Sequence, residues 1–273
     1  MRSMLRLLAA VALLLGAVGL VVWAIRDEDQ GIETVTPDVL TVATAFPAPG
    51  FWEGRDVRHV DGGFEAELAR ELADQLGLDR VAVVSRPFDE LVEGDAAGFD
   101  LALAQVSITR ERAKVVDFSR PYLTTPVGVV GRAGADPLPD LADAREQRWG
   151  VAEATTQVDV VDDLIEPDTD AVVYPTVAAA LTAVARGAVD VAAVDFLRAL
   201  AEVDEQPALA VAAQVTAPQH FGALLPDGSD LLSDVDAALR ALEADGTLDD
   251  LRDDLFDRYD TDLSDLPTIR VTP

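Results

Sequence analysis

The stretch SITRERAKVVDFSRPY, residues 107–122, gathers positive charge in a chain that is otherwise strongly acidic. It contains Arg110, Arg112, Arg120 and Lys114, and Lys114 is the only lysine in the protein. The whole chain has 50 Asp and Glu residues against 21 Lys and Arg residues, a formal net charge of -29. A local concentration of cations in such a chain indicates a site for a negatively charged group.

The residues on either side of Thr109 suggest how such a group would be held. A strand is predicted over residues 100–108, DLALAQVSI, and a short helix is predicted to follow Thr109, which is a good N-cap. The first turn of that helix contains Arg112, whose guanidinium can hold a carboxylate through two parallel N–H bonds. A helix N-terminus also exposes unpaired N–H groups and the positive end of a dipole. The alternative, which this stretch alone leaves open, is a capped surface helix with solvated arginines.

The composition excludes several classes of function. The acidic net charge argues against nucleic acid as a partner, because phosphate would be repelled. The absence of cysteine excludes disulfides, thiol nucleophiles and Cys-ligated metal sites. His59 and His220 are far apart in the sequence, and the phosphate-loop, zinc-protease and serine-hydrolase motifs are absent. We therefore expect neither a metal nor a cofactor.

The first residues predict a segment that enters or crosses a membrane. A basic flank precedes an uncharged, mostly apolar run over residues 7–25, and the acidic sequence RDEDQG follows. This order fits export with the N-terminus inside the cell, and the run is just long enough to span a bilayer. We expect residues 1–25 to be a signal peptide or an N-terminal membrane anchor, and residues 26–37 to be a linker. The bulky Trp23 at a poor cleavage signal, and the lack of a lipid-bearing cysteine, favour the uncleaved anchor.

After the linker, short β-branched runs alternate with helical patterns. Phe64, Leu68, Leu72 and Leu76 follow one another at a spacing of four, which is typical of one buried helix face. One set of strands is predicted over residues 39–45, 81–86, 100–108 and 126–132, and a second set over residues 148–154, 171–175, 189–195, 209–215 and 221–226. This alternation predicts an α/β fold with mostly parallel sheets, and two sets without a long linker between them predict two lobes.

The opening stretch resembles the signature of the family 3 extracellular solute-binding proteins, which are the amino-acid receptors of ABC importers. Other segments of the chain resemble further motifs of that family, and they occur in the same order as in the family. They are VATAFPAPGFW (42–52), GFEAELARELADQLGL (63–78), RPFDEL (86–91), WGVAEATTQ (149–157), GAVDVAAVD (187–195) and the segment 221–256. The likeness spans residues 39–257, and the ordered set is specific although each motif alone is weak.

The resemblance implies a periplasmic-binding-protein type 2 fold, in which two α/β lobes are joined by two hinge strands and the ligand lies in the cleft between them. Carried onto this chain, the expected parts are lobe 1 over residues 38–125 and 222–262, lobe 2 over residues 128–218, and a C-terminal tail over residues 263–273. The two crossings between the lobes are expected near residues 124–130 and 216–223.

The resemblance also implies roles for individual residues in the cleft. Arg112 is expected to bind the α-carboxylate of an amino acid, and Asp195 its α-ammonium group. Supporting contacts are expected from Ser107, Thr109, Thr155 and Thr156, and from the rings of Phe88 and of either Phe46 or Phe51. The residues themselves leave simpler roles open. Asp195 and the two threonines 155 and 156 could cap helices, and Phe88 could belong to the core.

The chain departs from the family pattern at several positions near the expected cleft. Ala45 replaces a common acidic residue, and Gln105 replaces a common small glycine. Glu153 and Ala154 replace a small residue and a glycine before the two threonines. The identity of the ligand therefore does not follow from the resemblance.

The implied function is that of a receptor, not an enzyme, which captures an amino acid or a similar zwitterion and delivers it to an ABC importer. Its expected partners are the small ligand, the importer permease and the membrane through residues 7–25, and we expect a monomer at the cell surface or in the periplasm. Two alternatives stay open. One is a membrane-anchored sensor or accessory binding protein. The other is an enzyme similar to cyclohexadienyl dehydratase, for which Glu153 is the candidate acid.

Overall fold

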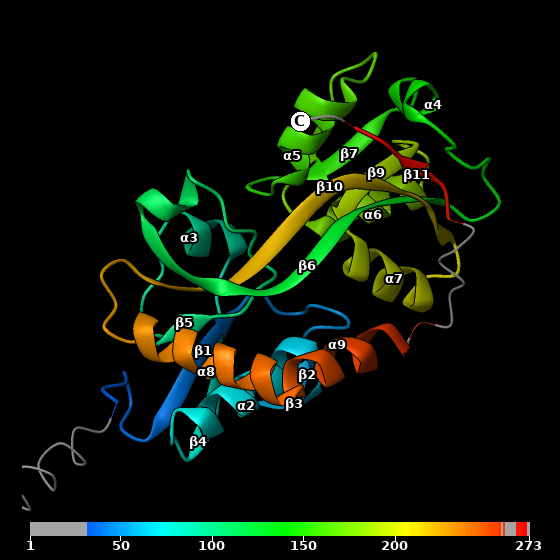
Figure 1. The fold of residues 1–273 in the computed structure, drawn as a ribbon. Helices are drawn as coiled ribbons and strands as arrows, with labels where there is room; N and C mark the ends of the chain where they lie inside the picture. Colours follow the sequence, from blue (N-terminus) through cyan, green and yellow to red (C-terminus); the bar gives the residue numbers. More distant parts are fainter. Residues whose placement is uncertain (1–31, 258, 260–265, 272–273) are drawn as a thin grey trace, which may run out of the picture. The chain divides into compact units, whose positions relative to one another are not determined.

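Two long antiparallel strands, β6 (Val116–Arg132) and β10 (Leu209–Pro226), form the centre of the sheet. This is a computed structural model, and it describes residues 32–257, 259 and 266–271. The sheet runs in the order β4-β1-β5-β10-β6-β9-β7-β8. Figure 1 shows both long strands passing from one group of strands to the other. They connect two parts of the sheet, which we call the first half (β1, β4 and β5) and the second half (β7, β8 and β9).

The first half is built from parallel strands. Every residue of β1 (Val39–Thr44) is buried, and β1 pairs in parallel with β4 (Arg80–Ser85) and with β5 (Leu101–Ala102). Parallel strands buried on both faces are expected to be mostly apolar, as the sequence VLTVAT of β1 is. The smaller elements of this half are the hairpin of β2 (Glu53–Asp56) and β3 (His59–Gly62), and the short helix α3 (Phe88–Val92).

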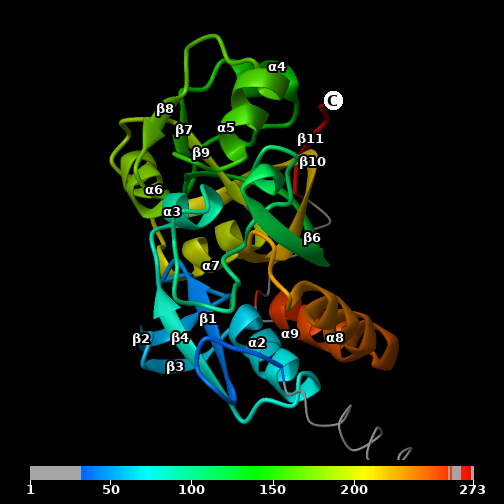
Figure 2. The same cartoon turned by 90° about the vertical axis from the view of Figure 1, so that its left-hand side faces the viewer.

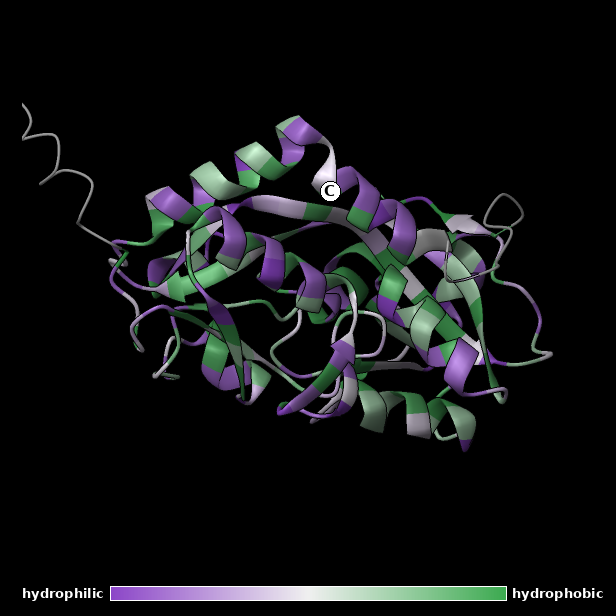
Figure 3. Ribbon diagram, turned by 90° about the horizontal axis from the view of Figure 1, so that it is seen from below, coloured by the Kyte–Doolittle hydropathy of each residue, from purple (hydrophilic) through white to green (hydrophobic). Residues whose placement is uncertain are grey.

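Three helices cover this half. α2 (Phe64–Gln75) lies beside α8 (Leu232–Asp245) and α9 (Thr247–Asp257), as Figures 1 and 2 both show. Leu68 and Leu72 of α2 are fully buried, which confirms the helix face that the spacing predicts. Figure 3 shows hydrophobic and hydrophilic residues alternating along these helices, the pattern of elements that bury only one face.

The second half repeats the parallel arrangement. β7 (Trp149–Ala152) pairs in parallel with β8 (Val172–Tyr174) and β9 (Val191–Asp195), and β9 pairs with β6 in the antiparallel sense. Its helices are α4 (Leu141–Arg145), α5 (Gln157–Asp159) with the π-helical turn Val160–Ile165, α6 (Val177–Ala185) and α7 (Phe196–Glu205). Trp149 is completely buried in the core of this half.

The two long strands contribute to the cores of both halves. Val127 of β6 and Val215 of β10 belong to a core cluster of the second half. Val116 and Leu224, near the other ends of the same strands, belong to a core cluster of the first half. The β6–β10 pairing is irregular between Val215 and Gln219, which lies between these two anchored regions. Ladder irregularities of this kind are where a strand pair bends.

The neighbourhood of Arg112 differs from the prediction. The helix expected after Thr109 is only a single 3-10 turn, Arg112–Lys114, so the predicted helix is wrong, although Thr109 still accepts a hydrogen bond from the N–H of Arg112. The reason is that β6 begins at Val116, which leaves room for one turn. The strand expected over residues 100–108 is also shorter, because regular pairing is confined to β5 and resumes only as an isolated bridge at Ser107.

The predicted tail, residues 263–273, contains an element that no sequence pattern indicated. β11 (Thr268–Ile269) pairs in parallel with Gln214 and Val215 of β10. Ile269 and Val271 are buried in the same core cluster as the other apolar residues of the second half. The chain therefore returns to the second half after α9.

The α/β class predicted from the sequence is confirmed. The predicted membrane segment, residues 1–25, and the first part of the linker lie outside the described residues. Within the part of the chain that the structure describes, no helix has the length and apolar character that crossing a membrane requires. The lobe boundaries stay a prediction.

Candidate functional site

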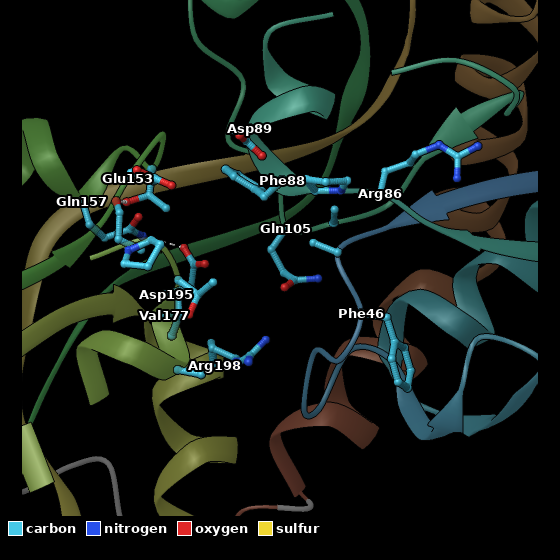
Figure 4. Close-up of a pocket in the computed structure, with 18 of the residues that line it drawn as sticks. Phe46, Arg86, Phe88, Asp89, Gln105, Glu153, Gln157, Val177, Asp195 and Arg198 are labelled. Carbon is cyan, nitrogen blue, oxygen red and sulfur yellow. Dashed lines mark hydrogen bonds between the residues drawn. The ribbon is translucent and has the colours of Figure 1, made fainter. Parts of the chain in front are cut away.

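A cavity of about 490 Å³ lies where segments attached to both halves of the sheet meet. From the first half its wall includes Phe46, Arg86, Phe88, Gln105, Ser107 and Arg112, and from the second half Glu153, Thr155, Thr156, Gln157, Asp195 and Arg198. Figure 4 shows Gln105 of the first group and Asp195 of the second beside the same space. Its volume falls in the range of small-molecule sites, about 300–1,000 Å³.

Arg112 is held at this cavity by contacts on both sides. Its Nη1 donates to the carbonyl oxygen of Ser107 at 2.8 Å, and its Nη2 donates to the carbonyl oxygen of Ala154 at 2.8 Å. Its guanidinium lies 5.5 Å from the ring centroid of Phe88. Burial lowers the pKa of Arg112 to about 10, although Asp195 and another nearby carboxylate act in the opposite direction. The residue is therefore a fixed cation at neutral pH.

Asp195 supplies a carboxylate from the other side of the cavity. It ends β9 at the N-cap position of α7, yet its side chain makes no capping hydrogen bond to that helix. One of its oxygens instead accepts a hydrogen bond from Nε2 of Gln157 at 2.8 Å. Burial raises the pKa of Asp195 to about 6, and Gln157, Arg198 and Arg112 oppose that shift. The carboxylate is thus ionised for the most part at neutral pH, and a cation beside it would be stabilising.

A chain of hydrogen bonds connects the polar residues of the cavity. The hydroxyls of Ser107 and Thr156 share a hydrogen bond of 3.4 Å, and Thr156 also accepts one from Nε2 of Gln219. Oε1 of Gln219 accepts from Nε2 of Gln157 at 3.0 Å. Ser107 thereby connects to Asp195 through side chains of both halves. Thr155 also lines the cavity, but its hydroxyl is already engaged as a donor to the carbonyl oxygen of Ala152 at 2.7 Å.

Two of the expected residues are not part of the cavity wall. Thr109 accepts a hydrogen bond from the backbone N–H of Arg112 at 3.2 Å, so it caps the 3-10 turn that carries the arginine. Phe51 is fully buried, and its ring packs edge-on against Phe64 and Phe221 at centroid distances of 6.2 and 6.4 Å. Of the two aromatic candidates in the first loop, the structure therefore places Phe46 at the cavity.

Several cavity residues were not assigned a ligand-binding role from the sequence. Gln157 directly follows the two threonines of WGVAEATTQ, so the motif itself could have indicated it. Gln219 does not line the cavity, but it bonds Gln157 and Thr156, which do. It lies on a long strand outside every motif, and no sequence signal points to it. Among the described residues no cluster of His, Asp and Glu side chains has the arrangement that a metal ion requires.

The comparisons with known proteins agree with this arrangement. The family described as bacterial extracellular solute-binding proteins, family 3, matches residues 40–258 of the chain. ABC transporter arginine-binding protein 1 of Escherichia coli K12 is 29% identical over 201 residues, covering 71% of this chain and 81% of that protein. The L-cystine-binding protein TcyJ of the same organism is 29% identical over 197 residues, covering 71% and 74%. Both of these relatives are named as binding proteins and not as enzymes.

A relative of another kind and a solved structure complete the comparison. The membrane-bound lytic murein transglycosylase F of Pseudomonas fluorescens Pf-5 is 28% identical over 254 residues, covering 88% of this chain and 51% of that protein. The structure of an ancestral arginine-binding protein bound to glutamine aligns with a TM-score of 0.71 at 27% identity, covering 81% of this chain and 99% of that chain. The predicted fold, a two-lobed periplasmic-binding-protein type 2 architecture, is thereby confirmed.

Proposed function

The chain belongs to the family 3 bacterial extracellular solute-binding proteins, and we propose that it captures an amino acid or a similar small zwitterion and delivers it to an ABC importer. The observation that carries this proposal is the presence of Arg112 and Asp195 in one cavity, each from a different half of the sheet. The relatives named as arginine- and cystine-binding proteins support the same class of ligand.

The two charges match the two charges of a free amino acid. Such a ligand carries a carboxylate and an ammonium group on one carbon, so its receptor needs a fixed cation and a fixed anion close together. Arg112 can hold a carboxylate through parallel N–H bonds, and it is already fixed by its own hydrogen bonds. Asp195 can accept from an ammonium group, because Gln157 bonds only one of its oxygens. Ser107 and Thr156 add hydroxyl groups between them.

We further propose that capture involves closure of two lobes. Lobe 1 comprises residues 38–125 and 222–262, and lobe 2 comprises residues 128–218. A ligand that bonds both Arg112 and Asp195 favours the conformation in which both contacts are made at once. The irregular β6–β10 pairing next to Val215 supports a hinge at this place.

The proposed place of action is outside the cytoplasm, at the cell surface or in the periplasm. In this proposal the apolar run over residues 7–25 keeps the chain at the membrane, near the importer permease that receives the ligand. The match to extracellular solute-binding proteins supports the location. We propose a monomer as the functional unit.

We also propose that the chain is not an enzyme. The acid that a dehydratase-like reaction would need in this cavity is Glu153. That side chain is exposed to solvent, whereas a general acid is normally positioned by neighbours and shielded from water. Exposure of Glu153 therefore supports binding without turnover.

The experiment that tests the function is calorimetry of the full chain with a panel of L-amino acids, followed by chemical analysis of the ligand that is recovered. Saturable binding of one or more amino acids, with the ligand recovered unchanged, is the expected result. Small-angle scattering should show a smaller radius of gyration with saturating ligand. Conversion of the ligand would contradict the receptor assignment, and failure of every amino acid to bind would contradict the ligand class.

A further inference from the structure

Gln105 has an uncommon backbone conformation on the wall of the cavity. Its φ of 51° places it in the left-handed region, which is disfavoured for residues other than glycine. It lies between β5 and Ser107, and its side chain is among those that line the cavity. A residue stays in such a conformation when its surroundings hold it there, and such residues concentrate at functional sites.

Glu65 is the residue that holds Gln105. Its side chain is completely buried at the start of α2. Oε1 of Glu65 accepts the backbone N–H of Gln105 at 2.7 Å, and Oε2 accepts from Nε2 of the same glutamine. The carboxylate is itself fixed by two aromatic donors, since Oε1 accepts from the hydroxyl of Tyr122 and Oε2 accepts from Nε1 of Trp52 at 2.9 Å. One buried carboxylate therefore accepts hydrogen bonds from both the backbone and the side chain of Gln105.

These hydrogen bonds determine which atom of the Gln105 carboxamide faces the ligand. A carboxylate only accepts hydrogen bonds, so the nitrogen of Gln105 must face Glu65 and the oxygen must face away from it. Both hydrogen bonds that hold Gln105 use its N–H groups. Figure 4 shows the carboxamide of Gln105 projecting into the space bounded by Phe88, Asp195 and Arg198. The cavity thus receives an acceptor of fixed orientation.

Two other arginines of the cavity wall, Arg86 and Arg198, are already engaged. Arg198 forms an ion pair with Glu202 at 2.6 Å. Arg86 donates to the carbonyl oxygens of Ser85 and Ala97 at 2.9 and 3.0 Å. An acidic ligand group would therefore have to compete with these existing partners for either guanidinium.

We propose that Gln105, oriented by Glu65, determines specificity by selecting amino acids whose side chain donates a hydrogen bond. The preferred class is an amino acid with an amide, guanidinium or ammonium side chain. An acidic side chain would bring acceptor against acceptor, and an aliphatic one would leave the Gln105 oxygen unpaired in a closed cavity. This inference rests on the proposed function, because it assumes that an amino acid occupies the cavity.

The test compares the affinities of L-glutamine, L-glutamate and L-norleucine for the full chain by calorimetry at about pH 8, where Glu65 is mostly ionised. We expect L-glutamine to bind at least about tenfold more tightly than the other two, the effect of one well-made hydrogen bond. Gln105→Gly suits the positive φ and removes the acceptor, so it should abolish the preference. Glu65→Gln should reduce it, because an amide partner lets the Gln105 carboxamide turn over.

The matched control is Glu67→Gln, on the same helix, where Glu67 pairs with Arg70 at the surface. It should keep the wild-type ratio of affinities. Glycine adopts a φ of 51° without strain, so Gln105→Gly is expected to fold and decides the matter even where Glu65→Gln is unstable. An unchanged ratio in Gln105→Gly overturns this inference and leaves the receptor function standing. Failure of wild type to bind any amino acid of the larger panel overturns both.

Discussion

Arg112 donates a hydrogen bond of 2.8 Å to the carbonyl oxygen of Ala154, so a cation of the first half is bonded to the backbone of the second half. Ala154 has a φ of 59°, which turns its carbonyl group within reach of the guanidinium. The side chain that we expect to bind the ligand therefore also joins the two halves directly. Ligand binding and the contact between halves depend on the same group.

Replacing Arg112 by alanine should abolish measurable ligand binding. The change removes a charge-assisted pair and leaves the ligand carboxylate unpaired, at a cost of about 3 kcal/mol or more. The control is Arg110→Ala, since Arg110 is exposed and does not line the cavity. Calorimetry measures the affinities, and thermal unfolding checks that both variants fold. Equal affinities in the two variants would refute the role given to Arg112.

Ligand affinity should fall as the pH is lowered through about 6, the pKa that burial gives Asp195. An ammonium group favours the ionised carboxylate, so below that pKa binding must first release a proton. The dissociation constant should then rise by up to about tenfold per pH unit. Gln157, Arg198 and Arg112 are the groups that act on Asp195 from the neighbouring elements, and all three favour its ionised form.

The variant Asp195→Asn separates this effect from other titrations. It keeps the shape of the side chain but cannot be ionised, so binding should weaken by about 2–4 kcal/mol and lose its dependence on pH near 6. Calorimetry at several pH values measures both quantities. A variant that binds as tightly as wild type would mean that the ammonium group is held elsewhere.

Glu65 should make the stability of the protein depend on pH in the opposite sense to an ordinary salt bridge. Burial raises its pKa to about 7 in the folded state, whereas the unfolded chain has the ordinary value of 4.5. Between these values the folded state binds a proton that the unfolded state has lost, so this contribution falls as the pH rises toward about 7. Its full size is on the order of 3 kcal/mol.

The measurement is the difference in unfolding free energy between wild type and Glu65→Gln at about pH 5 and about pH 8. Wild type should lose stability relative to the variant as the pH rises, because glutamine does not titrate. Comparison with one variant cancels the titration of the other carboxylates. A difference that is constant with pH would show that Glu65 keeps an ordinary pKa.

In its native host the protein should remain with the membrane fraction. The apolar run over residues 7–25 is long enough to span a bilayer, and the chain has no cysteine for a lipid anchor. N-terminal sequencing of the mature protein shows whether residues 7–25 are retained or cleaved. A mature chain that starts at Ile25 or later would show that the run is only a cleaved signal.

The fold could be predicted where local pattern and global arrangement agree. The buried face of α2 follows from leucines at a spacing of four, and strand β1 follows from its mostly apolar, β-branched sequence VLTVAT. The continuous length of β6 could not be predicted, because Pro121 and the polar residues around it interrupt the strand pattern. Pro121 is tolerated because the β6–β10 register is irregular on both sides of its partner Gly222, so its missing N–H interrupts no regular ladder.

The site could be predicted where a residue belongs to a motif, and not where only tertiary pairing brings it to the cavity. Arg112, Asp195 and Phe88 reach the cavity from motif positions. Gln219 bonds the cavity residue Gln157 from the middle of a long strand, and the hydrogen bond from Gln105 to Glu65 joins residues far apart in sequence. Contacts of this kind depend on how α2 packs on the sheet, which no local periodicity encodes.

β11 gives the order of synthesis a structural consequence. The second half receives Ile269 and Val271 into its core only after α8 and α9, which cover the first half, have been made. On the ribosome the segment around Trp149 must therefore wait, with part of its apolar surface uncovered, for more than a hundred further residues. Such exposed intermediates are the species that aggregate or recruit chaperones during folding. Export of the chain in an unfolded state, before either half closes, would avoid that interval.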